Sequence, residues 1–355
     1  MRAFGFLLRT FCTVTLMGAT VPAIAADRGE FDVARWDNVL KSVRERAAAE
    51  RVSPDVVDAA RKNVSFVPSI IKSDRNQAEF KLTLDDYLSR TVSRTRIDNG
   101  HKKRAEYPSL LSRVQDAHGV PPHVILAFWG LESNYGAVKS RHRLVDAFVT
   151  LMYDGRREKF FGDQLMALLK IADKNNLDVA NIQGSWAGAM GHFQFIPTTL
   201  AQYGMDGNGD GRIDIINNVS DAMFSAGNYL SKLGWNQNER IARRVVIPAD
   251  FDLSLLDGKT KKNLVAWAEM GVTNPDGTPL PTADMTAGIV GDINAIAAAR
   301  DANANIDTTN MDTDTPPHAV YTAYLAYPNF YRIKKWNSSN FYAIAIAELA
   351  DRLKQ

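Results

Sequence analysis

The sequence has a single cysteine, Cys12, and this residue lies within the first 25 residues. A disulfide needs two cysteines, and thiol catalysis needs one in the folded chain. If the first 25 residues are removed, the remaining chain has neither. Disulfide-bonded small folds and cysteine enzymes are therefore excluded for that chain.

Long apolar runs are also missing, except at the beginning, where "MRAFGFLLRTFCTVTLMGATVPAIA" precedes Ala26. Its basic start, apolar middle and small residues predict a secretory signal peptide over 1–25, cleaved after Ala25. A membrane anchor is the alternative, but Thr, Gly and Pro dilute the run and no apolar span of about 20 residues follows. Arg9 stands where a lipid-attachment signal at Cys12 would need a small or apolar residue. We therefore expect a periplasmic protein that is neither a lipoprotein nor stably inserted in a membrane.

An excess of charge of one sign is also missing. The formal net charge is +2, and Arg2 and Arg9 account for it, so the chain after residue 25 is formally neutral. Nucleic-acid binding needs clustered Lys and Arg that neutralise phosphates, and no basic stripe is present. We expect no nucleic-acid partner.

Helical apolar spacing dominates the first two thirds of the chain. Several of these stretches begin with Ser or Pro, which suit the first positions of a helix. The predicted helices are 31–50, 53–63, 83–93, 107–118, 121–132, 157–176 and 219–235.

The pattern changes near Arg244. "RVVIPADFDL" predicts a strand, and "AVYTAYLAYPNFYRIKKW" predicts two strands around a Tyr-Pro-Asn turn. Between them, residues 285–316 are rich in Ala, Asp, Asn and Thr, which predicts a flexible insertion. A capped amphipathic helix ends the chain. The fold class is therefore mainly α, with a small antiparallel β region.

An acid ends an apolar segment in "PPHVILAFWGLESNYG", where Glu132 follows Trp129 on a helix face that they share with Ile125. A carboxyl group against apolar and aromatic surface has a raised pKa, about 6 or above, and can donate a proton at neutral pH. The alternative is a structural glutamate paired with an arginine.

A glycine-rich segment, residues 184–204, carries Ser185 and Gln194 among aromatic residues. Small residues let the backbone approach a ligand, and Ser and Gln hydrogen-bond to an uncharged, hydroxyl-rich partner. A tightly packed turn would have the same composition.

The stretch "DGNGDGRIDI" from Asp206 resembles a calcium-binding loop of the EF-hand type. Position twelve is Asn217 instead of the usual glutamate, and Asp221 can substitute if the loop is stretched. A polar turn without metal is the alternative. The predicted ligands of a structural calcium ion are Asp206, Asn208, Asp210, Arg212 through its carbonyl, Asp214 and Asp221.

These motifs occur together with Gly-Arg-Arg-Glu-Lys-Phe-Phe at 155–161 and with Tyr-Pro-Asn-Phe-Tyr and Trp-Asn-Ser-Ser-Asn-Phe-Tyr between 327 and 342. In this order they resemble the lytic murein transglycosylase B family, glycoside hydrolase family 103, over nearly all of the chain after residue 25. The resemblance implies a lysozyme-like helical core. It also implies cleavage of the MurNAc–GlcNAc β-1,4 bond of peptidoglycan without water, which leaves a 1,6-anhydro-MurNAc end.

The resemblance also implies roles for single residues. Glu132 would be both acid and base, no cofactor would be needed for the chemistry, and Arg156 and Arg157 would meet carboxylates of the peptide stem. Trp336 stands where the family often has tyrosine. The residues implied to contact the glycan are Ser185, Gln194, Tyr229, Trp336, Asn337 and Tyr342.

The same resemblance implies the organisation of the chain. We expect a helical N-terminal region over 26–105, a catalytic core over 106–240 with its calcium-type loop at 206–221, a β region over 241–335, and a C-terminal helix over 336–355 that returns to the core. The expected partners are glycan strands with peptide stems, other cell-wall enzymes are left open as partners, and the protein is expected to be a monomer.

A single acid distinguishes this chemistry from hydrolysis, because glycoside hydrolases generally use two carboxylates. The nearest candidates for a second acid are Asp146, Asp154 and Glu158, and Asp146 lies in an apolar pattern typical of a buried structural acid. One acid is enough if the substrate's own C6 hydroxyl is the nucleophile. A hydrolytic muramidase and a non-catalytic murein-binding scaffold are the alternatives.

Overall fold

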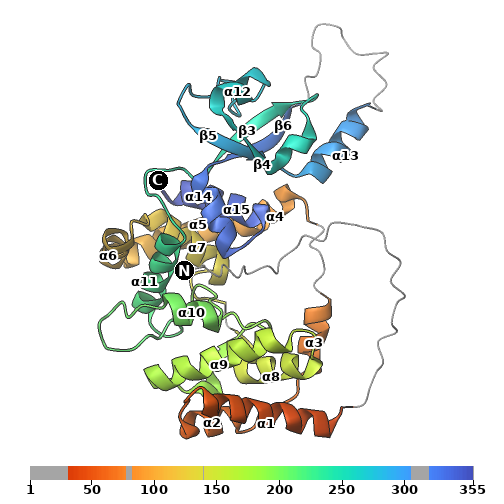
Figure 1. The fold of residues 1–355 in the computed structure, drawn as a ribbon. Helices are drawn as coiled ribbons and strands as arrows, with labels where there is room; N and C mark the ends of the chain where they lie inside the picture. Colours follow the sequence, from red (N-terminus) through yellow and green to blue (C-terminus); the bar gives the residue numbers. More distant parts are fainter. Residues whose placement is uncertain (1–30, 77–81, 139, 305–319, 355) are drawn as a thin grey trace, which may run out of the picture.

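The computed structural model describes residues 31–76, 82–138, 140–304 and 320–354. The predicted signal peptide lies outside these ranges. Within them, no helix is long and apolar enough to cross a membrane. Figure 1 shows three tiers: helices α1, α2, α3, α8 and α9 form the lowest, helices α5, α6, α7, α10, α11, α14 and α15 the middle, and a sheet with α12 and α13 the highest.

The chain is mainly helical, and most of its helices precede the sheet. All seven helices predicted for the first two thirds are present, as α1, α2, α4, α6, α7, α9 and α11. The helices up to the sheet are α1 Val33–Ala49, α2 Pro54–Arg61, α3 Pro68–Arg75, α4 Leu84–Thr91, α5 Arg94–Glu106, α6 Pro108–His118, α7 Pro122–Ser133, α8 Leu144–Asp154, α9 Glu158–Asn175, α10 Pro197–Tyr203 and α11 Val219–Lys232.

Proline sets the start of six helices, namely α2, α3, α6, α7, α10 and α14. Its fixed φ suits the first turn, where its missing N–H would have no partner in any case. Three of these helices, α2, α6 and α7, were predicted from the sequence. At α2, Ser53 precedes the helix as predicted, although its side chain makes no capping hydrogen bond.

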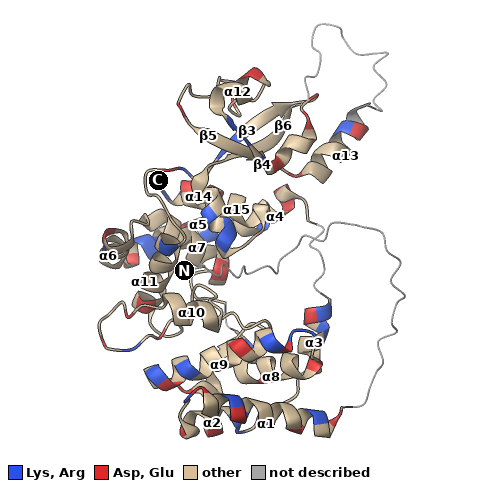
Figure 2. Ribbon diagram, in the orientation of Figure 1, with Lys and Arg blue, Asp and Glu red and all other residues tan. Residues whose placement is uncertain are grey.

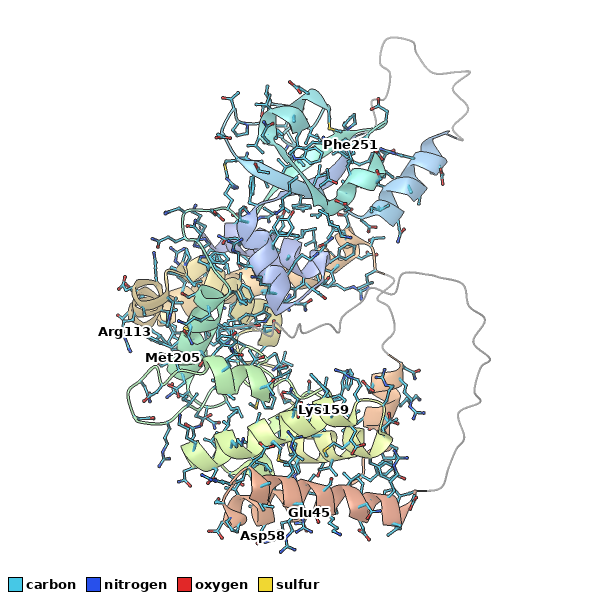
Figure 3. The ribbon with its side chains drawn as sticks, viewed as in Figure 1. Glu45, Asp58, Arg113, Lys159, Met205 and Phe251 are labelled. Atoms are coloured by element: carbon cyan, nitrogen blue, oxygen red, sulfur yellow. The ribbon has the colours of Figure 1, made fainter. Side chains whose placement is uncertain are left out.

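A four-stranded antiparallel sheet forms the upper tier, with the strand order β3-β6-β5-β4. It has its own apolar core, which includes Val245, Phe251, Trp267 and Leu325, and Figure 3 labels Phe251 there. The elements of this part are β3 Ala242–Pro248, the 3-10 helix η2 Leu253–Leu256, β4 Asp257–Asn263, α12 Leu264–Glu269, β5 Thr286–Val290, α13 Ile293–Ala304 and β6 Val320–Ala326. A two-stranded ladder of β1 His142–Arg143 and β2 Gln183–Gly184 lies near the 3-10 helix η1 Val179–Asn181.

The predicted flexible insertion at 285–316 is wrong over residues 286–304. Strand β5 lies inside the sheet between β6 and β4, and Ala287, Ile289 and Val290 are buried there. Asp292 then starts α13 by accepting a hydrogen bond from the backbone N–H of Ala295. The overall Ala/Asp/Asn composition did not reveal a short apolar strand and an alanine-rich helix. Val and Ile favour strands, and alanine favours helices. Residues 305–316 lie outside the described ranges.

The second strand predicted after the Tyr-Pro-Asn turn is also wrong, because residues 328–336 form helix α14 Pro328–Trp336. Pro328 is its first residue, and Asn329, Phe330 and Ile333 are buried at helical spacing. Asn329 fixes the helix start by donating to the backbone oxygens of Asn236 and Glu239. The aromatic residues suggested a strand, whereas proline at the first helical position was the stronger signal.

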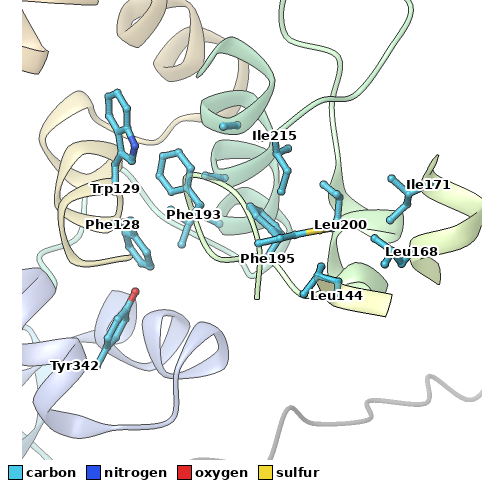
Figure 4. Packing of buried hydrophobic residues seen from close by; sticks show 14 of the residues in the cluster. Phe128, Trp129, Leu144, Leu168, Ile171, Phe193, Phe195, Leu200, Ile215 and Tyr342 are labelled. Carbon is cyan, nitrogen blue, oxygen red and sulfur yellow. The ribbon is translucent and has the colours of Figure 1, made fainter. Parts of the chain in front are cut away.

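The last helix, α15 Asn340–Lys354, packs against α7 and α5 in the middle tier. Its predicted cap is present, since the backbone N–H of Tyr342 donates to Ser339 Oγ at 3.3 Å. This packing brings residues 336–342 next to the end of α7, some 200 positions earlier in the chain. Figure 4 shows Tyr342 reaching from α15 towards Phe128 of α7.

Candidate active site

Glu132 lies in the last turn of α7, which ends at Ser133. Asn134 terminates the helix in the left-handed conformation with φ 49°, which asparagine tolerates better than most residues. Gly130 leaves room for Tyr135, because a Cβ at Gly130 would lie 2.7 Å from the Tyr135 hydroxyl oxygen. The sequence Gly-Leu-Glu-Ser-Asn-Tyr-Gly thus stops the helix one residue after the acid.

Two aromatic side chains from the C-terminal segment donate hydrogen bonds to one oxygen of Glu132. The Tyr342 hydroxyl donates to Oε1 at 2.6 Å, and the Trp336 indole N–H donates to the same atom at 3.0 Å. The Trp336 ring packs on Phe128 with centroids 4.8 Å apart, and Phe128 is fully buried. A carboxyl group with both donors on Oε1 carries its own proton on Oε2.

Burial raises the pKa of Glu132 from 4.5 to about 7, because desolvation disfavours the charged form. The hydrogen bonds from Tyr342 and Trp336 act in the opposite direction, since they stabilise the carboxylate. Across the described ranges, no neighbouring carboxylate contributes to this rise. Glu132 can therefore hold a proton near neutral pH and accept it back.

The end of α7 is held from its other side by the glycine-rich segment. Ser133 Oγ donates to the backbone oxygen of His192 at 2.6 Å and accepts from the backbone N–H of Gly136 at 2.9 Å. The Trp129 indole N–H donates to His192 Nδ1 at 3.0 Å. Trp129, which the sequence placed beside Glu132, is therefore buried against His192. The polar partners of Glu132 are instead Trp336 and Tyr342.

An aromatic cluster continues from Trp336 to Tyr229. The two rings lie 4.9 Å apart, and Tyr229 stacks on Tyr203 at 4.5 Å. Phe195, next to Gln194, packs on Trp336 at 5.4 Å. The structure thus brings Glu132, Trp336, Tyr342 and Tyr229 together.

Ser185, Gln194 and Asn337 take part in local turns. Ser185 Oγ accepts from the backbone N–H of Ala189, and Gln194, with φ 50°, donates to the backbone oxygen of Gly191. Asn337 Oδ1 accepts from the backbone N–H of Ser339 before α15. These hydrogen bonds shape the turns in which the three residues lie.

Arg156 and Arg157 both face one buried carboxylate, Asp74 of α3. Arg156 forms an ion pair with Asp74 Oδ2 and also donates to the Asp74 backbone oxygen at 3.2 Å, while Arg157 Nη1 lies 3.7 Å from Oδ1. Half of the Arg156 side chain is exposed, whereas Asp74 is 2% exposed. The two arginines are therefore held by Asp74 of α3, a contact that the sequence did not predict.

Two of the other acids considered near Glu132 have structural partners. Asp146 is buried and accepts from the backbone N–H of Ser65 at 3.1 Å, as the apolar pattern around it predicted. Asp154 pairs with Arg75 at 2.5 Å. Glu158 is the first residue of α9.

In the calcium-type loop, the aspartate side chains accept hydrogen bonds from backbone N–H groups of the loop itself. Asp206 accepts from the N–H groups of Gly209, Asp210 and Gly211, and Asp214 accepts from those of Ile216 and Asn217. No group of three or more His, Cys, Asp or Glu side chains in the described ranges is arranged to hold a metal. The structure therefore does not gather the predicted ligand set, and Asp214 uses its oxygens on the following turn.

Asp206 and Asp221 are the two carboxylates of this loop that interact, and both oxygens of Asp221 accept backbone N–H groups, from Gly207 and Asp214. Asp221 is fully buried, and desolvation raises its pKa, with a further contribution from the charge of Asp206. Arg113 reaches the loop from α6, but it donates to the backbone oxygen of Gly207, and Figure 3 labels it near Met205 on that side. Two neighbouring carboxylates, both oxygen donors, suit calcium better than zinc.

Tyr87 of α4 is a neighbour of the acid that the sequence reasoning missed. Burial raises its pKa first, and the charge of Glu132 raises it further. Its ring lies 6.0 Å from that of Phe341. No local pattern distinguishes Tyr87 from the other residues of an amphipathic helix, so only the packing of α15 on α4 reveals it.

Comparison with known proteins identifies the family. A family model described as "Transglycosylase SLT domain" matches residues 35–351. The chain belongs to this transglycosylase family. Membrane-bound lytic murein transglycosylase B of Escherichia coli (strain K12) is 31% identical over 265 residues, which are 74% of this chain and 65% of that protein. The family resemblance inferred from the motifs is confirmed.

Solved transglycosylase structures share the fold. SltB3 from Pseudomonas aeruginosa, in complex with NAG-anhNAM-pentapeptide, has a TM-score of 0.78 and 33% identity, over 90% of this chain and 79% of that one. The Escherichia coli lytic transglycosylase Slt35 in complex with calcium has a TM-score of 0.71 over 89% of this chain and 92% of that one. Its 24% identity supports likeness of fold alone. The predicted fold class, a lysozyme-like helical core with a small antiparallel β region, is confirmed.

Proposed function

We propose that this transglycosylase cleaves the MurNAc–GlcNAc β-1,4 bond of peptidoglycan without water and leaves 1,6-anhydro-MurNAc ends. The observation that carries the proposal is Glu132, one acid with a pKa of about 7 and two hydrogen-bond donors on a single oxygen. A general acid is most effective when its pKa lies near the working pH. The family and the muropeptide bound to SltB3 support the substrate class.

The first step needs the protonated form of Glu132. Its Oε2 proton passes to the glycosidic oxygen as the bond from that oxygen to C1 of MurNAc breaks. The 2-acetamido group of the same sugar stabilises the positive anomeric carbon. Tyr342 and Trp336 stabilise the carboxylate that remains, because both already donate to Oε1.

In the second step Glu132 acts as the base. It takes the proton from the C6 hydroxyl, whose oxygen attacks C1 and closes the anhydro ring. The nucleophile belongs to the same molecule, so its effective concentration exceeds that of competing water. Glu132 ends protonated, ready for the next strand, and no second carboxylate is required.

The surrounding residues have roles in binding. Tyr229 and Trp336 would stack on the sugars, and Ser185, Gln194, Asn337 and Tyr342 would bind polar groups of the glycan. Arg156 and Arg157 would bind stem carboxylates as bidentate partners. A calcium ion between Asp206 and Asp221 would stabilise the loop and take no part in the chemistry. The leader-like first 25 residues support a periplasmic location, and we expect a monomer there.

Glu132→Gln is the direct test. The amide keeps the shape and the acceptor for Tyr342 and Trp336 but has no transferable proton. Release of muropeptides from purified sacculi should fall at least about 10²-fold, the low end of what a positioned general acid contributes. Circular dichroism should show an intact fold. Near-native release would reject the assignment. Rapid release of reducing ends by the parent protein would instead support a hydrolytic muramidase, and binding without any cleavage would support a scaffold.

A further inference from the structure

Four lysines gather where strand β4 meets helix α14, and together they form what we name the lysine face: Lys259, Lys261, Lys334 and Lys335. Lys262 points to the other side of the strand, where its Nζ lies 5.9 Å from the centre of the Trp267 ring. Contacts between the two elements are direct, since the Tyr331 hydroxyl donates to the Gly258 backbone oxygen at 2.6 Å. Lys261 Nζ lies 4.5 Å from the centre of the Tyr331 ring. Lys334 and Lys335 follow Tyr331 by three and four residues, which places them on its side of the helix.

The positive charge of this face is poorly compensated. The lysine ion pairs of the described ranges involve Lys41, Lys103, Lys159 and Lys170, and none of the four lysines of this face. Asp257 is the one acid on β4, and it accepts from the backbone N–H groups of Lys259 and Thr260. Lys334 is half-buried, and desolvation together with the charge of Lys259 lowers its pKa. An anion would relieve that repulsion.

Protection of the sheet edge explains only part of the cluster. Strand β4 is the outer strand of the sheet, and lysines on an edge strand discourage pairing with another chain. Lys334 and Lys335 lie on a helix, where this reason does not apply. Figure 2 shows blue segments both on the sheet and on the helices directly below it.

The lysine face borders the candidate active site. Trp336, which donates to Glu132, follows Lys335 directly, and Tyr331 is about 7.5 Å from Trp336 along the helix axis. Arg156 and Arg157 connect α8 and α9 in the lowest tier, whereas α14 and β4 lie above α7 (Figure 1). A strand bound at Glu132 would therefore have the arginine pair on one side and the lysine face on the other.

We propose that the lysine face binds the carboxylates of a second peptide stem, carried by the same glycan strand on the other side of the cleaved bond from the stem at Arg156 and Arg157. The proposal rests on the proposed function, because only a glycan at Glu132 brings a stem to this position. The lysine face would bind a peptide carboxylate. The enzyme would therefore prefer strands with stems on both sides of the cleaved bond.

The test compares two triple variants in the Glu132→Gln background, so that binding is measured without turnover. One carries Lys259→Gln, Lys261→Gln and Lys335→Gln. The matched control removes the same charge from exposed lysines on α5, α9 and α11, with Lys102→Gln, Lys174→Gln and Lys232→Gln. Lys334 is left in place, because it donates to Asn340 Oδ1 at the start of α15.

Affinity is measured by co-sedimentation with sacculi and with glycan strands from which the stems have been removed. The lysine-face variant should bind sacculi about fivefold or more weakly at low salt, with a smaller change on stripped strands. The difference should disappear in roughly 1 M salt, where the screening length is about 3 Å. The control should bind like the parent.

An equal loss of affinity in the control, or an equal loss on stripped strands, would overturn the proposal. A loss of affinity seen only with phosphatidylglycerol vesicles would also overturn it, because it would indicate a membrane surface as the ligand. Cleavage of stripped strands by the unaltered protein reports the proposed function separately. If the unaltered protein cleaves stripped strands but the lysine substitutions leave binding unchanged, only this proposal fails and the proposed function stands.

Discussion

At the residue scale, the behaviour of Glu132 is set by a competition between burial and two donors. Desolvation raises its pKa to about 7, and Trp336 and Tyr342 keep it from rising further. In the proposed mechanism the reaction begins with the protonated acid, so activity should decline as the pH rises through about 7. Its position at the end of an apolar helix was readable from the sequence. Its donors, 204 and 210 positions away, were not, because no spacing rule links such distant residues.

Trp336→Phe tests the role of the indole donor. The ring remains while the N–H is lost, so the carboxylate loses one stabilising hydrogen bond and the pKa of Glu132 rises. The alkaline limb of the pH–rate profile should move up by about one pH unit. Trp235→Phe is the control, because its buried indole N–H has no hydrogen-bond partner in the described ranges. An unmoved limb in Trp336→Phe would contradict this role.

The raised pKa of Glu132 should also cost stability at neutral pH. A carboxyl group that titrates near 7 when folded and near 4.5 when unfolded binds more protons in the folded state between these values. Stability therefore falls as the pH rises through this window and stays lower above it. Glu132 is partly exposed, so Glu132→Gln should raise the free energy of unfolding at pH 8 by about 1–3 kcal/mol. Urea titration at about pH 4 is the comparison, because the gain in unfolding free energy should vanish there. Equal gains at both pH values would refute the link between the Glu132 pKa and stability.

At the element scale, the sequence located seven helices of the first two thirds, left α3, α5, α8 and α10 unpredicted, and was wrong at two places in the last third. Proline and amphipathic spacing are local signals, and they located α1, α7, α9 and α11. Strand β5 and helix α14 were missed because their identity depends on partners. Thr286–Val290 is a strand because β4 and β6 flank it, and Phe330 and Ile333 are buried by tertiary packing. The motif residues were found, but Tyr87 and Asp74 lie on helices with no distinguishing local pattern.

Calcium should stabilise the loop from Asp206 without serving the reaction. Binding to the folded state alone adds about 2.7 kcal/mol at a hundredfold excess over Kd. Calcium should therefore raise the melting temperature, a chelator should lower it, and Asp206→Asn should remove the difference. Activity at low temperature should survive chelation. Identical melting curves with and without calcium would exclude the metal, and chelation that abolishes activity of the folded protein would place it in the mechanism.

The arginine pair should favour strands that carry stems. Arg156→Ala with Arg157→Ala should reduce cleavage of stem-bearing strands more than cleavage of stripped glycan. It also leaves Asp74 buried without a counter-charge, so it should lower stability. Asp74→Asn is the control, because it breaks the same ion pairs while keeping both guanidinium groups. Equal losses on both substrates in the arginine variant would show a purely structural role.

At the scale of the whole molecule, the fold joins distant segments around one acid. Helix α7 supplies Glu132, α14 and α15 supply Trp336 and Tyr342, and the glycine-rich segment holds the helix end through His192. The arginine pair lies between the lower helices α8 and α9, and the lysine face lies on strand β4 and helix α14. A protein that is formally neutral after residue 25 thus gathers positive charge beside its site, where an anionic polymer would lie.

The central claim is that one carboxyl group performs both proton transfers while the substrate supplies the nucleophile. Digestion of purified sacculi in heavy-oxygen water, followed by mass spectrometry of the released muropeptides, tests it most directly. The products should carry 1,6-anhydro ends, one water lighter than hydrolysis products, with no heavy oxygen at the new ends, and Glu132→Gln should release almost none. Reducing ends that carry heavy oxygen would show that water is the nucleophile and would contradict the claim.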